Sequence, residues 1–120
     1  MHINQEIQEQ PEVIARLLAS EQDNIANIVT AIRDFDPAFV MIAARGTSDN
    51  AARYAKYILS IHAQMPVALA TPSVHTLYDA TPNLSRALVI GISQSGQGQD
   101  VLRVISDAKA QGALTLCMTN

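Results

Sequence analysis

Apolar residues recur at helical spacing along the first third of the chain and predict a helix over residues 5–33. One stripe consists of Ile14, Leu17 and Leu18, and a second of Ile25, Ile28, Val29 and Ile32. Pro11 suits a first helical position, because the N–H that proline lacks would be unpaired there. The stretch from Asp34 to Pro37 ends the helix, since the residue before a proline avoids helical backbone. We therefore predict an N-terminal helical segment over residues 1–36.

The pattern changes after this segment to short, continuous apolar runs. Such runs are typical of strands buried on both faces of a parallel sheet, and we predict strands over residues 39–44, 67–70, 87–92 and 113–118. Helices are predicted over 49–63, 73–80 and 97–111, with Gly112 as the last helix's C-terminal cap. The inward residues of that helix are expected to be Val101, Leu102, Val104, Ile105 and Ala108.

Strands that alternate with helices predict an α/β fold with a parallel sheet and right-handed crossovers. We assign residues 37–120 to this domain. The chain stops soon after the fourth predicted strand, whereas a doubly wound sheet normally continues with a further loop and helix. The prediction is therefore a domain incomplete at its C-terminal end; a complete four-stranded domain is the alternative.

Composition narrows the possible partners of the protein. The chain has 120 residues, of which 48% are hydrophobic and 16% charged, as expected for one globular domain. Its net charge of -3 excludes general electrostatic binding to nucleic acid or to an anionic membrane. A single cysteine, Cys117, excludes an intrachain disulfide and a cysteine-rich metal site. Without a membrane-length apolar run or a signal-like start, a cytoplasmic location is expected.

Two loops rich in hydroxyl groups and glycine follow the first and third predicted strands, and both lead into helices. Ligands of open parallel sheets bind beyond the carboxyl ends of the strands, where backbone N–H groups and helix N-termini favour anions. The candidate binding residues are Gly46, Thr47, Ser48, Ser93, Gln94, Ser95, Gly96 and Gly98. Ordinary helix capping and turn formation are the alternative for either loop alone. Neither loop contains a Walker or a dinucleotide fingerprint.

The runs Ala44–Ala52 (ARGTSDNAA) and Ile92–Gly96 (ISQSG) resemble the SIS (sugar isomerase) domain. The opening stretch Gln5–Pro11 (QEIQEQP) is similar to the start of the isomerase half of the glutamine–fructose-6-phosphate aminotransferase family. The resemblance implies a three-layer αβα, flavodoxin-like parallel sheet and a phosphosugar ligand. It also implies a homodimer and a second SIS domain downstream.

By matching position, the resemblance places Thr47 and Ser48 of the first loop near the sugar phosphate. It places Ser93, Gln94 and Ser95 of the second loop there as well. The aminotransferase pattern usually continues Ser-Gly-Glu-Thr, whereas this chain has SGQG over residues 95–98, so Gly98 lacks the family's hydroxyl. The stretch 72–78 is closer to relatives that lack the glutaminase half. With no N-terminal cysteine nucleophile, glutamine hydrolysis is not expected of this chain.

The resemblance implies a phosphosugar-binding domain of an isomerizing aminotransferase-like protein in amino-sugar metabolism. The ligand would be a hexose 6-phosphate such as fructose 6-phosphate or glucosamine 6-phosphate, and neither a metal nor an organic cofactor is implied. One alternative is an amino-sugar-phosphate deaminase or deglycase with the same phosphate site. A second alternative, from another class, is a non-catalytic sensor that binds a phosphosugar to control a regulator.

No catalytic base is identified within these residues, because the family's base and its helper lysine and histidine lie in the second domain. His75 is the one local candidate, and a surface or helix-capping role is favoured for it. Arg45 is equally suited to steering an anion and to a salt bridge with Asp49. The remaining candidates are assigned structural roles: His2 and His62 exposed, Asp100 a helix-dipole partner, the three tyrosines core or interface residues, and Cys117 inert on a buried strand.

Overall fold

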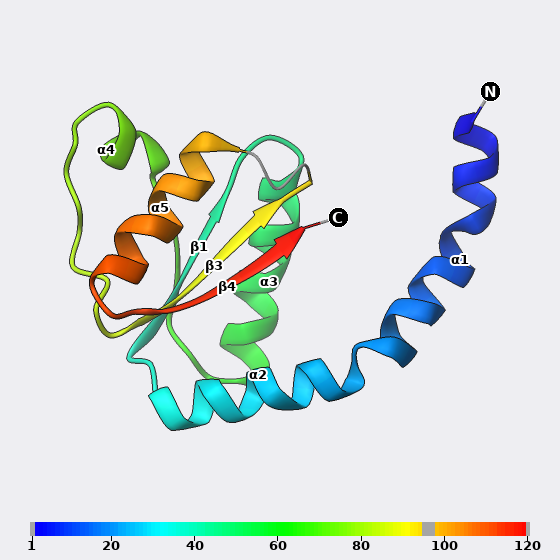
Figure 1. The fold of residues 1–120 in the computed structure, drawn as a ribbon, viewed down its shortest axis with the longest axis horizontal. Coiled ribbons are helices and arrows are strands. Elements are labelled where there is room, and N and C mark those ends of the chain that lie inside the picture. The colour runs from blue at the N-terminus through cyan, green and yellow to red at the C-terminus, as the bar shows by residue number, and fades with distance from the viewer. Residues whose placement is uncertain (1, 95–97, 120) are drawn as a thin grey trace. The chain divides into compact units, whose positions relative to one another are not determined.

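A computed structural model describes residues 2–94 and 98–119, and the chain forms two compact units, 1–34 and 35–120 (Figure 1). The first unit contains α1 (His2–Ser20) and most of α2 (Gln22–Phe35). One continuous helix is therefore a wrong prediction, since the helical segment is divided at Glu21. The prediction that Pro11 opens the helix is also wrong, because α1 begins at His2 and continues through Pro11.

Four parallel strands form the sheet of the second unit, in the order β2-β1-β3-β4. Their bounds are β1 (Phe39–Ala44), β2 (Val67–Leu69), β3 (Ala87–Ser93) and β4 (Leu114–Thr119). The ladder between β1 and β3 pairs six residues of each strand and ends with Ala44 opposite Ile92. The predicted parallel α/β fold is confirmed, with the neighbour order of a flavodoxin-like sheet.

Helices flank this sheet. The first is α3 (Ser48–His62), which links β1 to β2, and α5 (Gln99–Ala110) links β3 to β4. Because the two crossovers run in opposite directions along the sheet and each is right-handed, they cover opposite faces. A short helix, α4 (Pro72–Thr76), packs against α5 (Figure 1). The result is the three-layer arrangement that the resemblance implies.

The central strands and the inner face of α5 form the core. The largest fully buried side chains are Ile42, Leu84, Val40, Val89 and Val104. Leu102 was expected to face inward, but 42% of it is exposed. It is one residue, and hence about 100° of helix rotation, from the buried Val101. The inward stripe of α5 therefore excludes Leu102.

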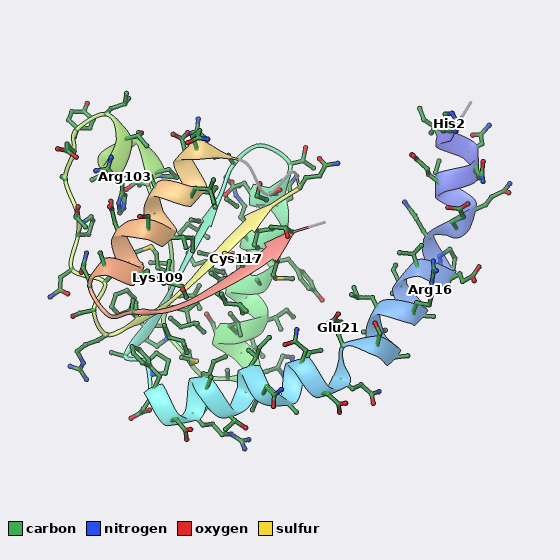
Figure 2. All side chains as sticks on the ribbon, in the orientation of Figure 1. His2, Arg16, Glu21, Arg103, Lys109 and Cys117 are labelled. Atoms are coloured by element: carbon green, nitrogen blue, oxygen red, sulfur yellow. The ribbon has the colours of Figure 1, made fainter. Side chains whose placement is uncertain are left out.

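Two predictions about individual side chains of the second unit are also wrong. Cys117 was expected on a buried strand, but β4 is an edge strand whose last three residues are exposed (Figure 2). A core position was one of the two roles assigned to the tyrosines, and Tyr54, Tyr57 and Tyr78 are all mostly exposed. Aliphatic residues therefore provide the core without help from the tyrosine rings.

Two glycines determine how closely α5 packs against the sheet and where it ends. A Cβ built on Gly91 of β3 would lie 3.1 Å from side-chain atoms of both Val101 and Ile105, so the absence of a side chain lets α5 approach the sheet. At the other end of the helix, Gly112 has φ +85° and its N–H donates to the Lys109 carbonyl. The Ala113 N–H donates to the Ala108 carbonyl, which completes a Schellman motif and confirms Gly112 as the cap.

The helices in the described part of the chain include none that combines the length and apolar character needed to cross a membrane.

Candidate functional site

The loops that follow β1 and β3 lie side by side at one edge of the sheet. The strand order reverses between β1 and β3, because the chain moves from β1 outward to β2 and returns to place β3 on the other side of β1. Ligands of doubly wound sheets bind at such a switch point, beyond the carboxyl ends of the strands. The register of Ala44 opposite Ile92 brings the two loops to the same level.

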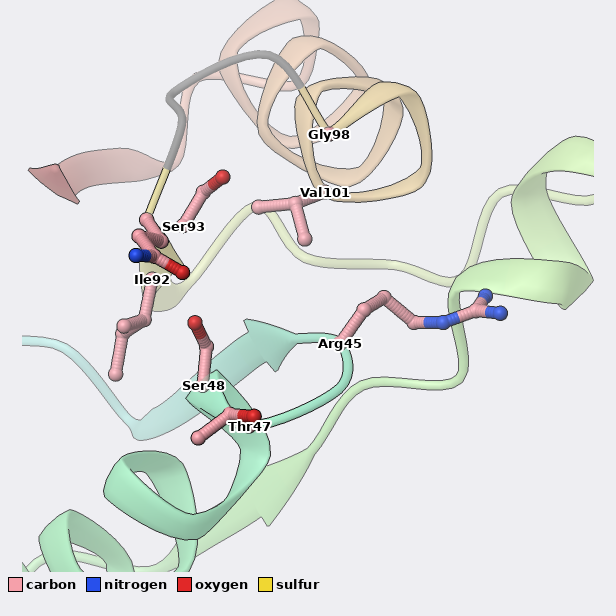
Figure 3. Close-up of a pocket in the computed structure, with 8 residues that line it drawn as sticks. Arg45, Thr47, Ser48, Ile92, Ser93, Gly98 and Val101 are labelled. Atoms are coloured by element: carbon pink, nitrogen blue, oxygen red, sulfur yellow. The ribbon is translucent and has the colours of Figure 1, made fainter. Parts of the chain in front are cut away.

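A pocket of about 260 Å³ occupies this position (Figure 3). Its described lining residues are Arg45, Thr47, Ser48, Ile92, Ser93, Gln94, Gly98 and Val101. Five of the eight predicted site residues are therefore brought together: Thr47, Ser48, Ser93, Gln94 and Gly98. Gly46 shapes the first loop without lining the pocket, and Ser95 and Gly96 lie outside the described residues.

The first loop turns tightly into α3. Gly46 has φ +60°, a left-handed conformation that glycine adopts without steric cost, and its carbonyl accepts a hydrogen bond from the Asp49 N–H at 3.1 Å. Thr47 occupies the N-cap position of α3, yet its side chain makes no capping hydrogen bond. Thr47 and Ser48 both line the pocket, at the positive end of the helix.

The second loop runs from β3 to α5. Ser93 is the last residue of β3, and Gly98 is the N-cap residue of α5. A Cβ on Gly98 would lie 3.6 Å from the Ser93 Oγ, which is ordinary van der Waals contact. The N-termini of α3 and α5 thus flank one pocket, and Ser48 and Ser93 lie across it from each other (Figure 3).

Arg45 connects the first loop to the start of α5. Its Nη1 donates to the Oδ2 of Asp100 at 2.5 Å, and Asp100 lies in the first turn of α5. The alternative pairing of Arg45 with Asp49 is therefore wrong, because Asp49 accepts from the Nε of Arg53 one helical turn away, at 3.2 Å. The position of Asp100 near the start of a helix agrees with the dipole role assigned to it.

A second hollow of about 250 Å³ shares Ser48, Ile92, Ser93 and Gln94 with the pocket. It extends to Met118 and Thr119 at the end of β4. The sequence analysis did not include these two residues among the candidates. They could have been predicted, because the carboxyl end of the fourth predicted strand lies at the same edge of a parallel sheet as the two loops.

His75 does not belong to the pocket lining. It is 2% exposed, and its Nδ1 lies 2.7 Å from Asp107 Oδ2 on α5. The predicted surface position of His75 is therefore wrong. Arg103 donates to both oxygens of Asp107 at 3.1 Å and also to Asp79. This network attaches α4 and the following loop to α5.

The network also sets the charge of Asp107. Burial raises the pKa of the Asp107 carboxyl, but hydrogen bonds from His75 and Arg103 and the charge of Arg103 outweigh burial, so the pKa lies below its usual range. The ionised carboxylate accepts hydrogen bonds only, so the Nδ1 of His75 is the donor. Asp79 and then Asp107 raise the pKa of Arg103 in turn.

The described lining residues suit binding better than proton transfer. They include hydroxyl groups, an amide and Arg45, but no carboxylate, histidine or lysine. Within residues 2–94 and 98–119, no group of three or more histidine, cysteine, aspartate or glutamate side chains is placed to hold a metal ion. The pocket therefore offers hydrogen-bond donors and two helix N-termini to a small polar ligand, while the Arg45 cation is paired with Asp100.

Comparison with known proteins identifies the family. Residues 37–120 match the SIS domain. The chain belongs to the SIS domain family. It is 32% identical to the glutamine–fructose-6-phosphate aminotransferase of Halobacterium salinarum over 96% of its own length and 20% of that protein's. The corresponding enzyme of Mycolicibacterium smegmatis is 34% identical, over 96% of this chain and 19% of the enzyme.

Solved structures give the same result for this SIS domain. A proposed phosphosugar isomerase from Silicibacter pomeroyi superposes with a TM-score of 0.91 at 39% identity, over 97% of this chain and 36% of that one. The C-terminal domain of glucosamine-fructose-6-phosphate aminotransferase from Francisella tularensis superposes with a TM-score of 0.77 at 27% identity. That comparison covers all of this chain and 35% of the other. The chain thus spans about a fifth of its curated relatives and about a third of these solved chains.

Proposed function

We propose that this SIS domain binds the phosphate of a hexose 6-phosphate and belongs to an isomerizing aminotransferase-like protein of amino-sugar metabolism. The single observation that supports the proposal most is the pocket at the β1/β3 switch point. Both predicted loops reach it, and each leads into the N-terminus of a helix. The relatives, named as aminotransferases of fructose 6-phosphate, support the ligand class.

The chemistry of the pocket fits a phosphate monoester. The Thr47, Ser48 and Ser93 hydroxyls can donate to phosphate oxygens, and the N-termini of α3 and α5 add partial positive charge. Hydrogen bonds to a charged group contribute about 1.5–3 kcal/mol each, so three of them give about 4.5–9 kcal/mol. That range corresponds to millimolar to micromolar dissociation constants, which are typical for a metabolite. The sugar would extend from the phosphate along the hollow toward Thr119.

The isomerisation itself needs a base that moves a proton between adjacent carbons. The described lining residues contain no such group, and His75 is held by Asp107 away from the lining. We therefore assign phosphate anchoring and sugar placement to this chain. The base is assigned to residues of the whole protein beyond those that line this pocket.

Calorimetric titration of the chain with fructose 6-phosphate, glucosamine 6-phosphate and glucose tests the proposal. We expect both phosphosugars to bind more tightly than glucose. The Ser48→Ala variant should weaken phosphosugar binding by about 1–3 kcal/mol, since one bond to a charged ligand is removed. Ser60→Ala is the matched control: Ser60 lies on α3 too, but its hydroxyl donates to the Lys56 carbonyl near the opposite end of the helix. Equal binding of glucose and the phosphosugars would refute the proposal.

The reaction type is tested on the whole protein that contains this chain. Formation of glucosamine 6-phosphate from fructose 6-phosphate and an amine donor supports an aminotransferase. Release of ammonia from glucosamine 6-phosphate without synthesis identifies the deaminase alternative instead. Phosphosugar binding without turnover identifies the sensor.

We also propose that the protein acts as a homodimer. Exposed apolar residues on α3, among them Tyr54, Tyr57 and Ile61, support an interface. Light scattering after size-exclusion chromatography measures the molar mass, and a monomer at all concentrations would refute this part of the proposal.

A further inference from the structure

The Arg45–Asp100 ion pair connects two elements that are distant in sequence. Arg45 follows β1, whereas Asp100 lies 55 positions later in the first turn of α5. The pair therefore connects the first loop of the pocket to the helix that follows the second loop. Its side chains are partly exposed, 59% for Arg45 and 34% for Asp100, so solvent weakens the pair's own contribution to stability.

Asp100 has opposite effects on the helix and on an anionic ligand. A carboxylate in the first turn stabilises a helix through the helix dipole. The same carboxylate repels an anion that binds at that helix end. Asp100 lies between Gly98 and Val101 in the chain, and both of these residues line the pocket. An unpaired Asp100 would therefore oppose the phosphate that the pocket is proposed to bind.

Arg45 carries the one formal charge among the described lining residues of the pocket. Figure 3 shows its side chain directed away from Ser48 and Ser93. The guanidinium donates a hydrogen bond to the Asp100 carboxylate and does not point into the pocket. Arg45 is therefore placed to neutralise the charge of Asp100.

We propose that Arg45 is a positioning residue of the pocket, which acts through Asp100 and not by direct contact with phosphate. The guanidinium cancels the negative charge at the start of α5 and holds the first loop against that helix. The helix N-terminus then remains available to an anion. This inference rests on the proposed phosphosugar binding and adds a charge-compensating pair to it.

Charge-removing variants separate the two possible roles of Arg45. Arg45→Met, Asp100→Asn and the double variant are titrated with fructose 6-phosphate by calorimetry. We expect Arg45→Met to bind about tenfold more weakly, because Asp100 is left uncompensated. Asp100→Asn should bind as tightly as the unchanged chain or more tightly. The double variant should return to within about threefold of the unchanged chain, since neither charge remains.

A matched control removes a cation from the opposite end of α5. Lys109 lies in the last turn of that helix and does not line the pocket, so Lys109→Met should change binding less than about twofold. Circular dichroism melting of each variant separates loss of binding from loss of structure. Restored binding in the double variant is a result that a purely structural tie would not produce.

Each of the remaining outcomes would overturn the inference, and one of them would overturn the proposed function as well. A double variant as weak as Arg45→Met would show that Arg45 contacts the phosphate directly or acts only as a structural tie, and either result would overturn the inference alone. Unchanged binding in Arg45→Met, or weakened binding in Asp100→Asn, would also overturn it. If the unchanged chain binds neither fructose 6-phosphate nor glucosamine 6-phosphate, the proposed function fails and the inference fails with it.

Discussion

The Nδ1 of His75 lies 2.7 Å from the Oδ2 of Asp107, and this contact connects the short helix α4 to α5. His75 is almost fully buried, so its hydrogen-bonding groups have little access to water. An ionised Asp107 is the acceptor that satisfies the histidine N–H. The pair therefore fixes the segment between β2 and β3 to the helix that starts at the pocket.

Removal of this acceptor should destabilise the fold. We expect Asp107→Ala to lower the free energy of unfolding by about 1–3 kcal/mol, because a buried donor loses its partner. Asp79→Ala is the matched control, since Asp79 shares Arg103 with Asp107 but is 86% exposed, and its removal should cost less than about 1 kcal/mol. Urea unfolding measures both values. Equal losses would contradict the structural role assigned to Asp107.

The lowered pKa of Asp107 predicts how this contribution depends on pH. The folded-state pKa lies below the unfolded value, so the stabilisation is present above about pH 4 and is lost as the pH falls through the folded pKa. The difference in unfolding free energy between the unchanged chain and Asp107→Asn should therefore shrink below about pH 4. A difference that stays constant from pH 7 to pH 3 would show that ionisation of Asp107 is not its source.

The close approach of α5 to Gly91 predicts an overpacking cost. A Cβ there would lie 3.1 Å from the Val101 and Ile105 side chains, so both must move. We expect Gly91→Ala to lower the free energy of unfolding by about 1–3 kcal/mol. A smaller residue at 105, in Gly91→Ala with Ile105→Val, should recover part of that loss. No recovery would show that the contact with Ile105 is not limiting.

The open position at Gly98 predicts a gain of binding. Its φ of -63° suits any residue, and a Cβ meets only ordinary contacts at 3.6 and 4.0 Å. Gly98→Ser adds a hydroxyl at the pocket edge, and we expect phosphosugar affinity to rise severalfold, consistent with about 1 kcal/mol for one added hydrogen bond. Gly98→Ala supplies the Cβ without the hydroxyl and should leave affinity near that of the unchanged chain. Equal affinities in the two variants would contradict the prediction.

The helical periodicity of α5 predicts that substitutions at two positions, two residues apart, change the free energy of unfolding by different amounts. Leu102 is 42% exposed, and Val104 is fully buried. We expect Leu102→Gln to change the free energy of unfolding by less than about 0.5 kcal/mol. Val104→Ala should lower it by about 1–3 kcal/mol through the cavity it leaves. Similar losses at the two positions would contradict the orientation of the helix.

The strands and the two loops could be predicted from sequence because their signals are local. Continuous apolar runs indicated the strands, and Gly46, Thr47 and Ser48 followed one of them directly. That the two loops share one pocket depends on β1 and β3 being neighbours, which was expected from the parallel fold and its family resemblance. Local signals were therefore sufficient to find most of the described pocket residues, whereas their common position came from the fold.

The errors in the second unit concern partners and exposure, which depend on tertiary contacts. Asp49 and Asp100 are both near helix starts, and sequence spacing favours the nearer one for Arg45, whereas the fold brings the distant one into contact. Cys117 lies in an apolar run that resembles a buried strand, but its exposure is decided by β4 being at the edge of the sheet. His75 carries no local signal of burial, because Asp107 is 32 positions away.

The six-residue ladder between β1 and β3 has a consequence for how proteins with this fold can diversify. The separation of the two loops is set by hydrogen bonds between adjacent strands and not by the length of chain that connects them. Insertions or deletions in the excursion between residues 63 and 86 would leave the spacing of Ser48 and Ser93 intact. Evolution can therefore remodel that segment while the spacing of the two pocket loops is inherited unchanged.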